Sequence, residues 1–139
     1  MVATEEMREY AFTRILDTSY EDAISRVTAA LKEEGFGVLT EIDVKETLKK
    51  RLGVDFRKYI ILGTCNPPYA HRTLRTDLDV GLLLPCNVMV YETDDQKTSV
   101  SAVNPVSALQ LIKNSELRKI AEEVSEKLKR VVDKIAESR

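Results

Sequence analysis

Residues 58–63 read Lys-Tyr-Ile-Ile-Leu-Gly, and this short apolar run carries most of the information about the fold class. A short run that is apolar at successive positions is typical of a strand covered on both faces. We therefore predict a strand with neighbouring strands on both sides. Asn66 and two prolines follow the run, which ends the strand and places a proline in the first turn of a helix.

Further strands and helices are predicted on either side of this run. Alternating polar and apolar residues predict strands over 9–16, 36–44, 88–92 and 98–103, with a hairpin turn between the last two. Apolar residues at helical spacing predict a helix that starts after Ser19 and stops at Gly35, a second helix over 44–52, and a third that begins at the prolines. The fold class that follows is α+β: a mostly antiparallel five-stranded sheet with the first and last helices packed on one face.

A long final helix, with Ser115 as its N-cap, is predicted from a broad apolar stripe. The stripe steps alternately by four and three through Leu117, Ala121, Val124, Leu128, Val131 and Ile135. A stripe this wide usually lies on a sheet, so we expect Leu128 at the centre of that contact.

The length of 139 residues indicates a single domain over 1–139, with 1–6 as a flexible N-terminal extension. Basic residues number 21 and acidic residues 23, and the net charge of -2 offers no broad positive field to a nucleic acid. The longest apolar cluster, over 80–85, is far shorter than the roughly 20 residues of a membrane helix, and the first residues carry acids instead of a secretory apolar run. We expect a soluble, cytoplasmic protein with no nucleic acid or membrane partner.

Signatures of nucleotide binding and of hydrolysis are missing from the sequence. It contains no phosphate-binding glycine loop, no nucleophile elbow and no zinc-binding helix motif. With a single histidine, His71, any mechanism that needs two imidazoles in one subunit is excluded. These observations leave open whether the protein is an enzyme.

Two cysteines occur in the same local setting, each beside an asparagine and a proline. The first lies in Cys65-Asn66-Pro67 and the second in Pro85-Cys86-Asn87. A thiol at the start of a helix, as expected for Cys65, is favoured as a reactive thiolate, and the alternative for either cysteine is a small buried side chain beside a tight turn. The two asparagines are expected to hydrogen-bond their own turn backbones, with ligand contact as the alternative.

Residues 59–68, 81–88 and 36–45 together resemble the domain-of-unknown-function family numbered 302. The resemblance extends over nearly the whole chain from about Met7 onward, and the pair of cysteine motifs makes it specific. It implies a small α+β domain with an antiparallel sheet and a tendency to dimerise, and it implies no particular activity. Because it makes the two strands antiparallel neighbours, it also implies that Cys65 and Cys86 meet at one end of the sheet, in one pocket and without a disulfide in a reducing compartment.

The candidate ligand-binding residues are Cys65, Asn66, Cys86 and Asn87. A metal ion is the cofactor to consider, with Cys65, Cys86 and His71, or a residue across a dimer axis, as its ligands. Oxygen ligands from Glu41, Asp43 and Glu92 are possible if the strand faces that carry them converge.

Two function classes and one structural alternative follow. The first is a dimeric binding module with a small-molecule or metal pocket near the two Cys-Asn turns. The second is a cysteine-dependent enzyme or redox protein that uses Cys65 or Cys86, with His71 as a base. In the third, both motifs serve only the fold. A homodimer is expected from the resemblance, and also because the two-faced strand over 58–63 and the broad stripe of the last helix need more cover than five short strands give.

Overall fold

A computed structural model describes residues 7–8 and 10–137 of the chain. The expected flexible extension over 1–6 lies outside the described residues. The strands are β1 (Met7–Arg8), β2 (Ala11–Leu16), β3 (Gly37–Asp43), β4 (Tyr59–Cys65), β5 (Cys86–Glu92) and β6 (Thr98–Val103). The helices are α1 (Tyr20–Glu33), α2 (Val44–Leu52), α3 (Pro67–Thr76), the 3-10 helix η1 (Leu78–Leu83), α4 (Pro105–Leu109) and α5 (Ser115–Glu137).

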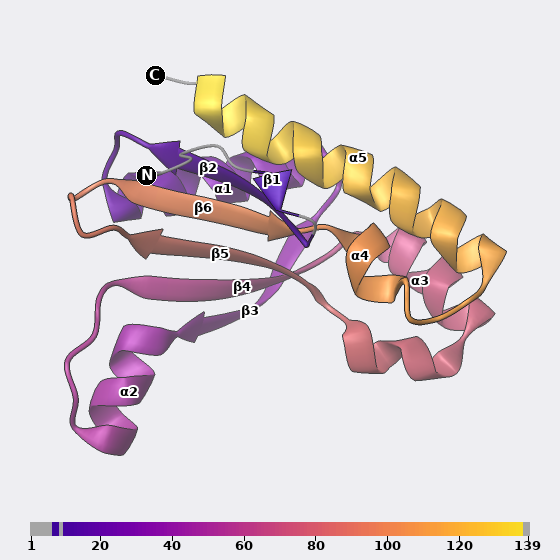
Figure 1. The fold of residues 1–139 in the computed structure, drawn as a ribbon, viewed down its shortest axis with the longest axis horizontal. Coiled ribbons are helices and arrows are strands. Elements are labelled where there is room, and N and C mark those ends of the chain that lie inside the picture. The colour runs from indigo at the N-terminus through magenta and orange to yellow at the C-terminus, as the bar shows by residue number, and fades with distance from the viewer. Residues whose placement is uncertain (1–6, 9, 138–139) are drawn as a thin grey trace.

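The strands form one antiparallel sheet in the order β1-β2-β6-β5-β4-β3 (Figure 1). The five predicted strands are all present. The two-residue strand β1 adds a sixth beside β2, and a segment this short carries no periodicity from which it could be predicted. The α+β fold class and the antiparallel sheet are therefore confirmed.

Helices α1 and α5 lie side by side on one face of the sheet, as predicted for the first and last helices. The sheet contributes valines and alanine that are fully buried, and each helix contributes its apolar stripe. The buried set includes Val27, Leu31, Leu62, Val88, Val90, Val100, Ala102, Leu128 and Val132. This core joins both helices to four of the strands, and a second buried cluster of Val80, Leu109 and Ala121 packs η1 and α4 against α5.

Helix boundaries follow the capping residues that the sequence supplies. The Ser19 hydroxyl accepts a hydrogen bond from the Asp22 amide at the start of α1, and Gly53 ends α2 with a left-handed backbone. The prediction of Ser115 as the cap of α5 is wrong by one residue. The side chain of Asn114 is the cap, because its oxygen accepts from the amides of both Glu116 and Leu117.

The face of the sheet opposite α1 and α5 is only partly covered by other described elements. Strand β4 buries Ile60 and Leu62 toward the helices but leaves Tyr59 and Ile61 half-buried on the other face. Tyr59 stacks on Tyr91 of β5 with ring centroids 5.3 Å apart. Strand neighbours on both sides of 58–63 were predicted correctly, whereas the described residues cover one face of the strand fully and the other only in part. We call this second surface the open face.

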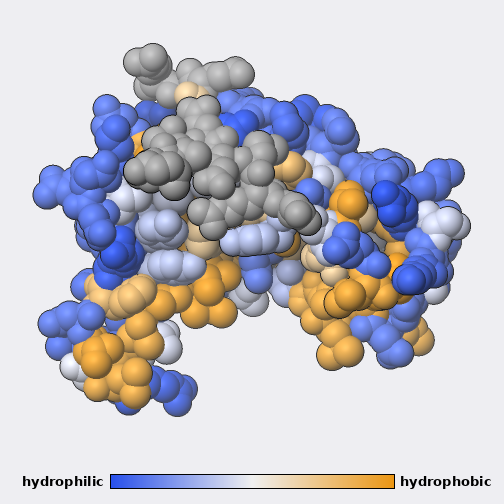
Figure 2. Space-filling view, in the orientation of Figure 1, coloured by the Kyte–Doolittle hydropathy of each residue, from blue (hydrophilic) through white to orange (hydrophobic). Residues whose placement is uncertain are grey.

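Two projections extend beyond the β3 edge of the sheet, α2 on one side and η1 on the other (Figure 1). None of the residues of α2, all of which the structure describes, is buried. Figure 2 shows hydrophobic surface on both projections, with a hollow between them. Among the described residues, no helix is long and apolar enough to span a membrane.

Candidate functional site

The antiparallel pairing of β4 with β5 brings the two cysteines to the same end of the sheet. Cys65 is the last residue of β4, Cys86 is the first residue of β5, and Cys86 is directly opposite Thr64. Both thiols are free. The shared position follows from the direction of the strands, because the end of one antiparallel strand lies beside the start of the next.

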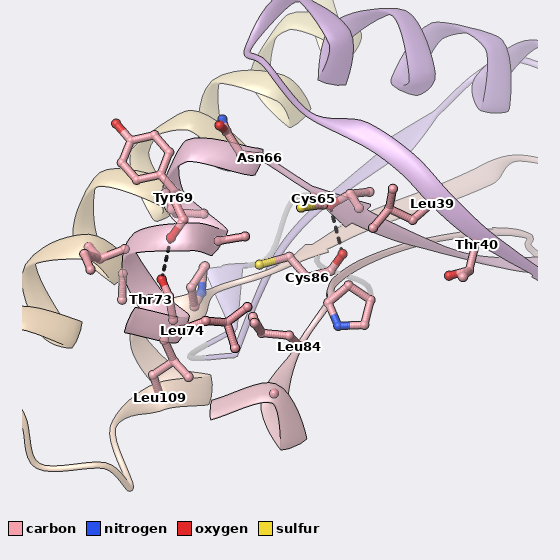
Figure 3. A pocket seen from close by; sticks show the side chains of 18 residues that line it. Leu39, Thr40, Cys65, Asn66, Tyr69, Thr73, Leu74, Leu84, Cys86 and Leu109 are labelled. Atoms are coloured by element: carbon pink, nitrogen blue, oxygen red, sulfur yellow. Dashed lines mark hydrogen bonds between the residues drawn. The ribbon is translucent and has the colours of Figure 1, made fainter. Parts of the chain in front are cut away.

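A cavity of about 400 Å³ lies at this end of the sheet, and both cysteines line it (Figure 3). We call it the cysteine pocket. Its walls come from β3, from α3, from the segment between η1 and β5, and from α4 and α5. The side chains that give it an almost wholly apolar surface include Leu39, Tyr69, Ala70, Leu74, Leu84, Leu109, Ile120 and Val124.

Two of the hydroxyl groups that line the pocket, on Thr64 and Thr73, donate their hydrogen bonds within the protein. The Thr64 hydroxyl donates to the Cys86 carbonyl at 2.9 Å, and the Thr73 hydroxyl donates to the Tyr69 carbonyl at 2.7 Å (Figure 3). Both threonines are buried. Their hydroxyl protons are therefore already used, in keeping with the almost wholly apolar surface of the pocket.

Asn66 joins two helices and does not brace its own turn as predicted. It occupies the N-cap position of α3, yet its side chain makes no capping hydrogen bond. Its amide Nδ2 instead donates to the Glu34 carbonyl at the end of α1, at 3.1 Å. Gly35 allows this approach, because a Cβ there would lie 3.1 Å from the same nitrogen and its backbone φ is +90°. The side chain is buried at the edge of the pocket, where it fixes α3 against α1.

Asn87 lies apart from the other three candidates. Successive residues of a strand point to opposite faces, so Cys86 faces the helices while Asn87 faces the open side. The structure places Asn87 in a groove of the open face with Met89 and Tyr91, and it does not line the cysteine pocket. Of the four candidate ligand-binding residues, the pocket brings together Cys65, Asn66 and Cys86.

Burial determines the protonation of Cys86. Removal from water, together with a smaller contribution from the nearby Cys65, raises the pKa of its thiol from 9.0 to about 11. Near neutral pH, Cys86 is therefore a neutral thiol. Cys65 directly precedes the N-cap residue Asn66, which is the helix start that the sequence predicts for it.

The metal site expected from Cys65, Cys86 and His71 does not form within one described chain. His71 is exposed on α3 and does not line the pocket. Glu92 ends β5, whereas Cys86 begins it, so that carboxylate lies at the opposite end of the strand from the cysteines. Across residues 7–8 and 10–137, the structure contains no group of three or more His, Cys, Asp or Glu side chains that could hold a metal ion.

Several pocket residues were missed in the sequence because their signal is shared with ordinary core positions. The sequence identifies Ala70 and Leu74 only as part of the apolar side of a helix. A helix that lines a pocket and a helix packed in the core have the same apolar periodicity, so the sequence pattern does not distinguish them. Leu39 reaches the pocket beside a register shift in the β3–β4 pairing. A bulge of this kind changes which side a residue faces, and strict alternation cannot predict it.

Comparison with known proteins gives the family and leaves the ligand open. The family model "Domain of unknown function DUF302" matches residues 12–135. A solved structure, described as the crystal structure of an uncharacterized conserved protein DUF302 from Bacillus stearothermophilus, is similar to this chain with a TM-score of 0.84 and 32% sequence identity. The match covers 91% of this chain and 98% of that one. No curated protein matches this chain. With the fold and most of its length shared in this way, the chain belongs to the DUF302 family.

Proposed function

We propose that this domain is a binding module that holds a small, uncharged, apolar molecule in the cysteine pocket. The observation that carries the proposal is the pocket itself, a cavity of about 400 Å³ with an almost wholly apolar lining. Ligand sites in proteins are typically cavities of about 300–1,000 Å³ lined by hydrophobic and aromatic side chains with a few polar groups. The cysteine pocket fits this description in both volume and lining.

The ligand class follows from the charge of the lining. No Asp, Glu, Lys, Arg or His side chain lines the pocket, and all of its lining residues are described. The raised pKa of Cys86 keeps that thiol neutral near pH 7. A charged ligand would lose its hydration without gaining a partner of opposite charge, which is costly. An uncharged apolar ligand loses little and gains dispersion contacts with the walls.

The same protonation argues against Cys86 as the nucleophile of a cysteine enzyme. Thiolate, and not thiol, is the nucleophile in cysteine chemistry. A Cys86 thiol with a pKa of about 11 is ionised to only about one part in ten thousand at pH 7. His71 is exposed on α3 outside the pocket and is not placed to act there as the base.

The direct test is binding of an uncharged apolar fluorophore, N-phenyl-1-naphthylamine, to the wild-type protein. Ala70→Phe fills the pocket from α3, because Ala70 is a half-buried lining residue. His71→Phe is the matched control, since it adds the same ring one position along the helix on the exposed side. We expect a fluorescence increase that saturates with wild type and with His71→Phe, and at least tenfold weaker binding with Ala70→Phe. Equal binding by Ala70→Phe, or no binding by wild type, would contradict the proposal and favour a structural role for the two motifs.

We also propose that the domain is a homodimer. Strand β3 pairs with β4 on one side only, and its outer edge has no partner among the described residues. Large apolar side chains are exposed beside that edge, on β3 itself, on and after α2, and on η1. Exposed apolar surface on this scale is typical of an interface. Sedimentation equilibrium of the wild-type protein tests the proposal, and a monomer at the highest concentrations would refute it.

A further inference from the structure

We infer that, in the homodimer proposed above, α2 of each copy docks against η1 of the other copy. The two contacts are related by a two-fold axis that passes through the hollow between the projections. The inference rests on the proposed homodimer and goes beyond it by naming the surfaces that meet.

Both projections carry leucine side chains that are mostly exposed to solvent. On η1, Leu78 is 83% exposed and Leu82 is 88% exposed. At the end of α2, Leu52 is 69% exposed, and it is followed by the exposed residues Val54 and Phe56. Each projection therefore offers an apolar surface that is covered by no other described element.

The two projections differ in charge. Helix α2 carries four basic residues and one acidic residue, namely Lys45, Lys49, Lys50, Arg51 and Glu46. The projection formed by η1 and its cap carries Asp77 and Asp79. The Asp77 carboxylate also accepts a hydrogen bond from the Asp79 amide, which holds the start of η1 in place. With its cap Asp43 and the following Asp55 included, the α2 projection carries four basic and three acidic residues, and Lys49 and Lys50 form ion pairs with Asp55 and Glu46. The α2 projection therefore keeps a small net positive charge and the η1 projection is acidic, with apolar side chains on both.

The positions of the projections restrict how two copies can meet. Both extend beyond the same edge of the sheet and stand on either side of the hollow (Figures 1 and 2). In a dimer with a two-fold axis through the hollow, α2 of one copy meets either α2 or η1 of the other copy. Pairing α2 with the partner's α2 would place two helices with an excess of basic residues against each other. Pairing α2 with the partner's η1 places basic residues beside acidic ones and leucines beside leucines, and symmetry forms this contact twice.

The contact also lies against the wall of the cysteine pocket. Gly81 of η1 lines the pocket, as do Leu84 and Pro85, which lead from η1 into β5. Docking of the partner's α2 on η1 would therefore support the segment that forms this wall.

Charge reversal on each projection tests the docking. The first variant, Lys50→Glu with Arg51→Glu, makes the end of α2 acidic. The second, Asp79→Lys, replaces the acidic residue within η1 itself by a basic one and keeps Asp77 as the cap. All three side chains are exposed, so the core is untouched. Arg118→Glu with Lys119→Glu is the matched control, because it reverses an adjacent exposed basic pair on α5 and breaks one i,i+4 ion pair, as the α2 variant does.

Dimer dissociation constants are measured by sedimentation equilibrium at low salt. We expect each charge variant alone to dimerise at least tenfold more weakly than wild type. An equimolar mixture of the two should recover dimers, because both contacts in the mixed dimer again join opposite charges. The control should match wild type. Circular dichroism checks folding, and Leu82→Ser probes the same contact if Asp79→Lys does not fold.

The results of these experiments distinguish the docking of α2 on η1 from the homodimer on which it rests. A wild-type dimer that neither charge variant weakens, or a mixture that stays monomeric while its components fold, would overturn the docking of α2 on η1 and leave the homodimer standing. A wild-type monomer would overturn both. Recovery in the mixture supports the docking.

Discussion

Cys86 connects the burial of one residue to a measurable pH dependence. Its thiol has a pKa of about 11 in the folded protein against an ordinary value of 9.0, so the folded state keeps the proton where the unfolded state has lost it. Stability from this residue is fully present below pH 9 and is lost as pH rises from 9 to 11. Guanidinium unfolding at pH 8 and pH 11 should show a loss that is smaller by about 2 kcal/mol in Cys86→Ala than in wild type. An identical loss in both proteins would contradict the assignment.

The two asparagines that follow the cysteines should differ when each is replaced by alanine. Asn66→Ala removes the hydrogen bond to the Glu34 carbonyl and should lower the free energy of unfolding by about 1 kcal/mol. Asn87→Ala is the control, because Asn87 is exposed on the open face, and its change should stay below about 0.5 kcal/mol. Chemical denaturation measures both. Equal effects would show that Asn66 does not join α1 to α3.

Helix α5 packs its apolar stripe against both the sheet and α1. Leu128 is fully buried at the centre of that helix, as its stripe predicts. Leu128→Ala should lower the free energy of unfolding by about 2 to 5 kcal/mol, because it leaves a cavity in the core. Glu126→Ala, exposed on the same helix, is the control and should change stability by less than about 0.5 kcal/mol. A small loss for Leu128→Ala would place the wrong face of α5 on the sheet.

Elements were predicted well where a local signal determines them. Ser19, Gly35 and Gly53 mark helix ends that depend on the backbone within a few residues, and all three were predicted from the sequence. Asn114 and Ser115 are both good caps, and the choice between them depends on which one the preceding turn from α4 brings into position. Local preference could not make that choice.

The direction of the strands could be predicted from the sequence, but the face on which each side chain lies could not. Antiparallel β4 and β5 place Cys65 and Cys86 at one end of the sheet, as expected from the resemblance and its motifs. Asn87 was expected beside them and faces the other side, because one residue along a strand reverses the face. His71 falls on the exposed side of α3, which depends on how that helix packs on α5. The pocket forms from five separate parts of the chain, so no single sequence motif predicts it.

Amide chemical shifts can locate an uncharged apolar molecule bound in the cysteine pocket. Nitrogen-15-labelled wild-type protein is titrated with N-phenyl-1-naphthylamine and followed by heteronuclear correlation spectra. We expect the largest shifts on Cys65, Cys86 and the pocket side of α3 around Ala70 and Thr73, and we expect them to saturate. Shifts confined to the open face around Tyr59 and Tyr91, or no shifts at saturating probe, would contradict binding in the cysteine pocket.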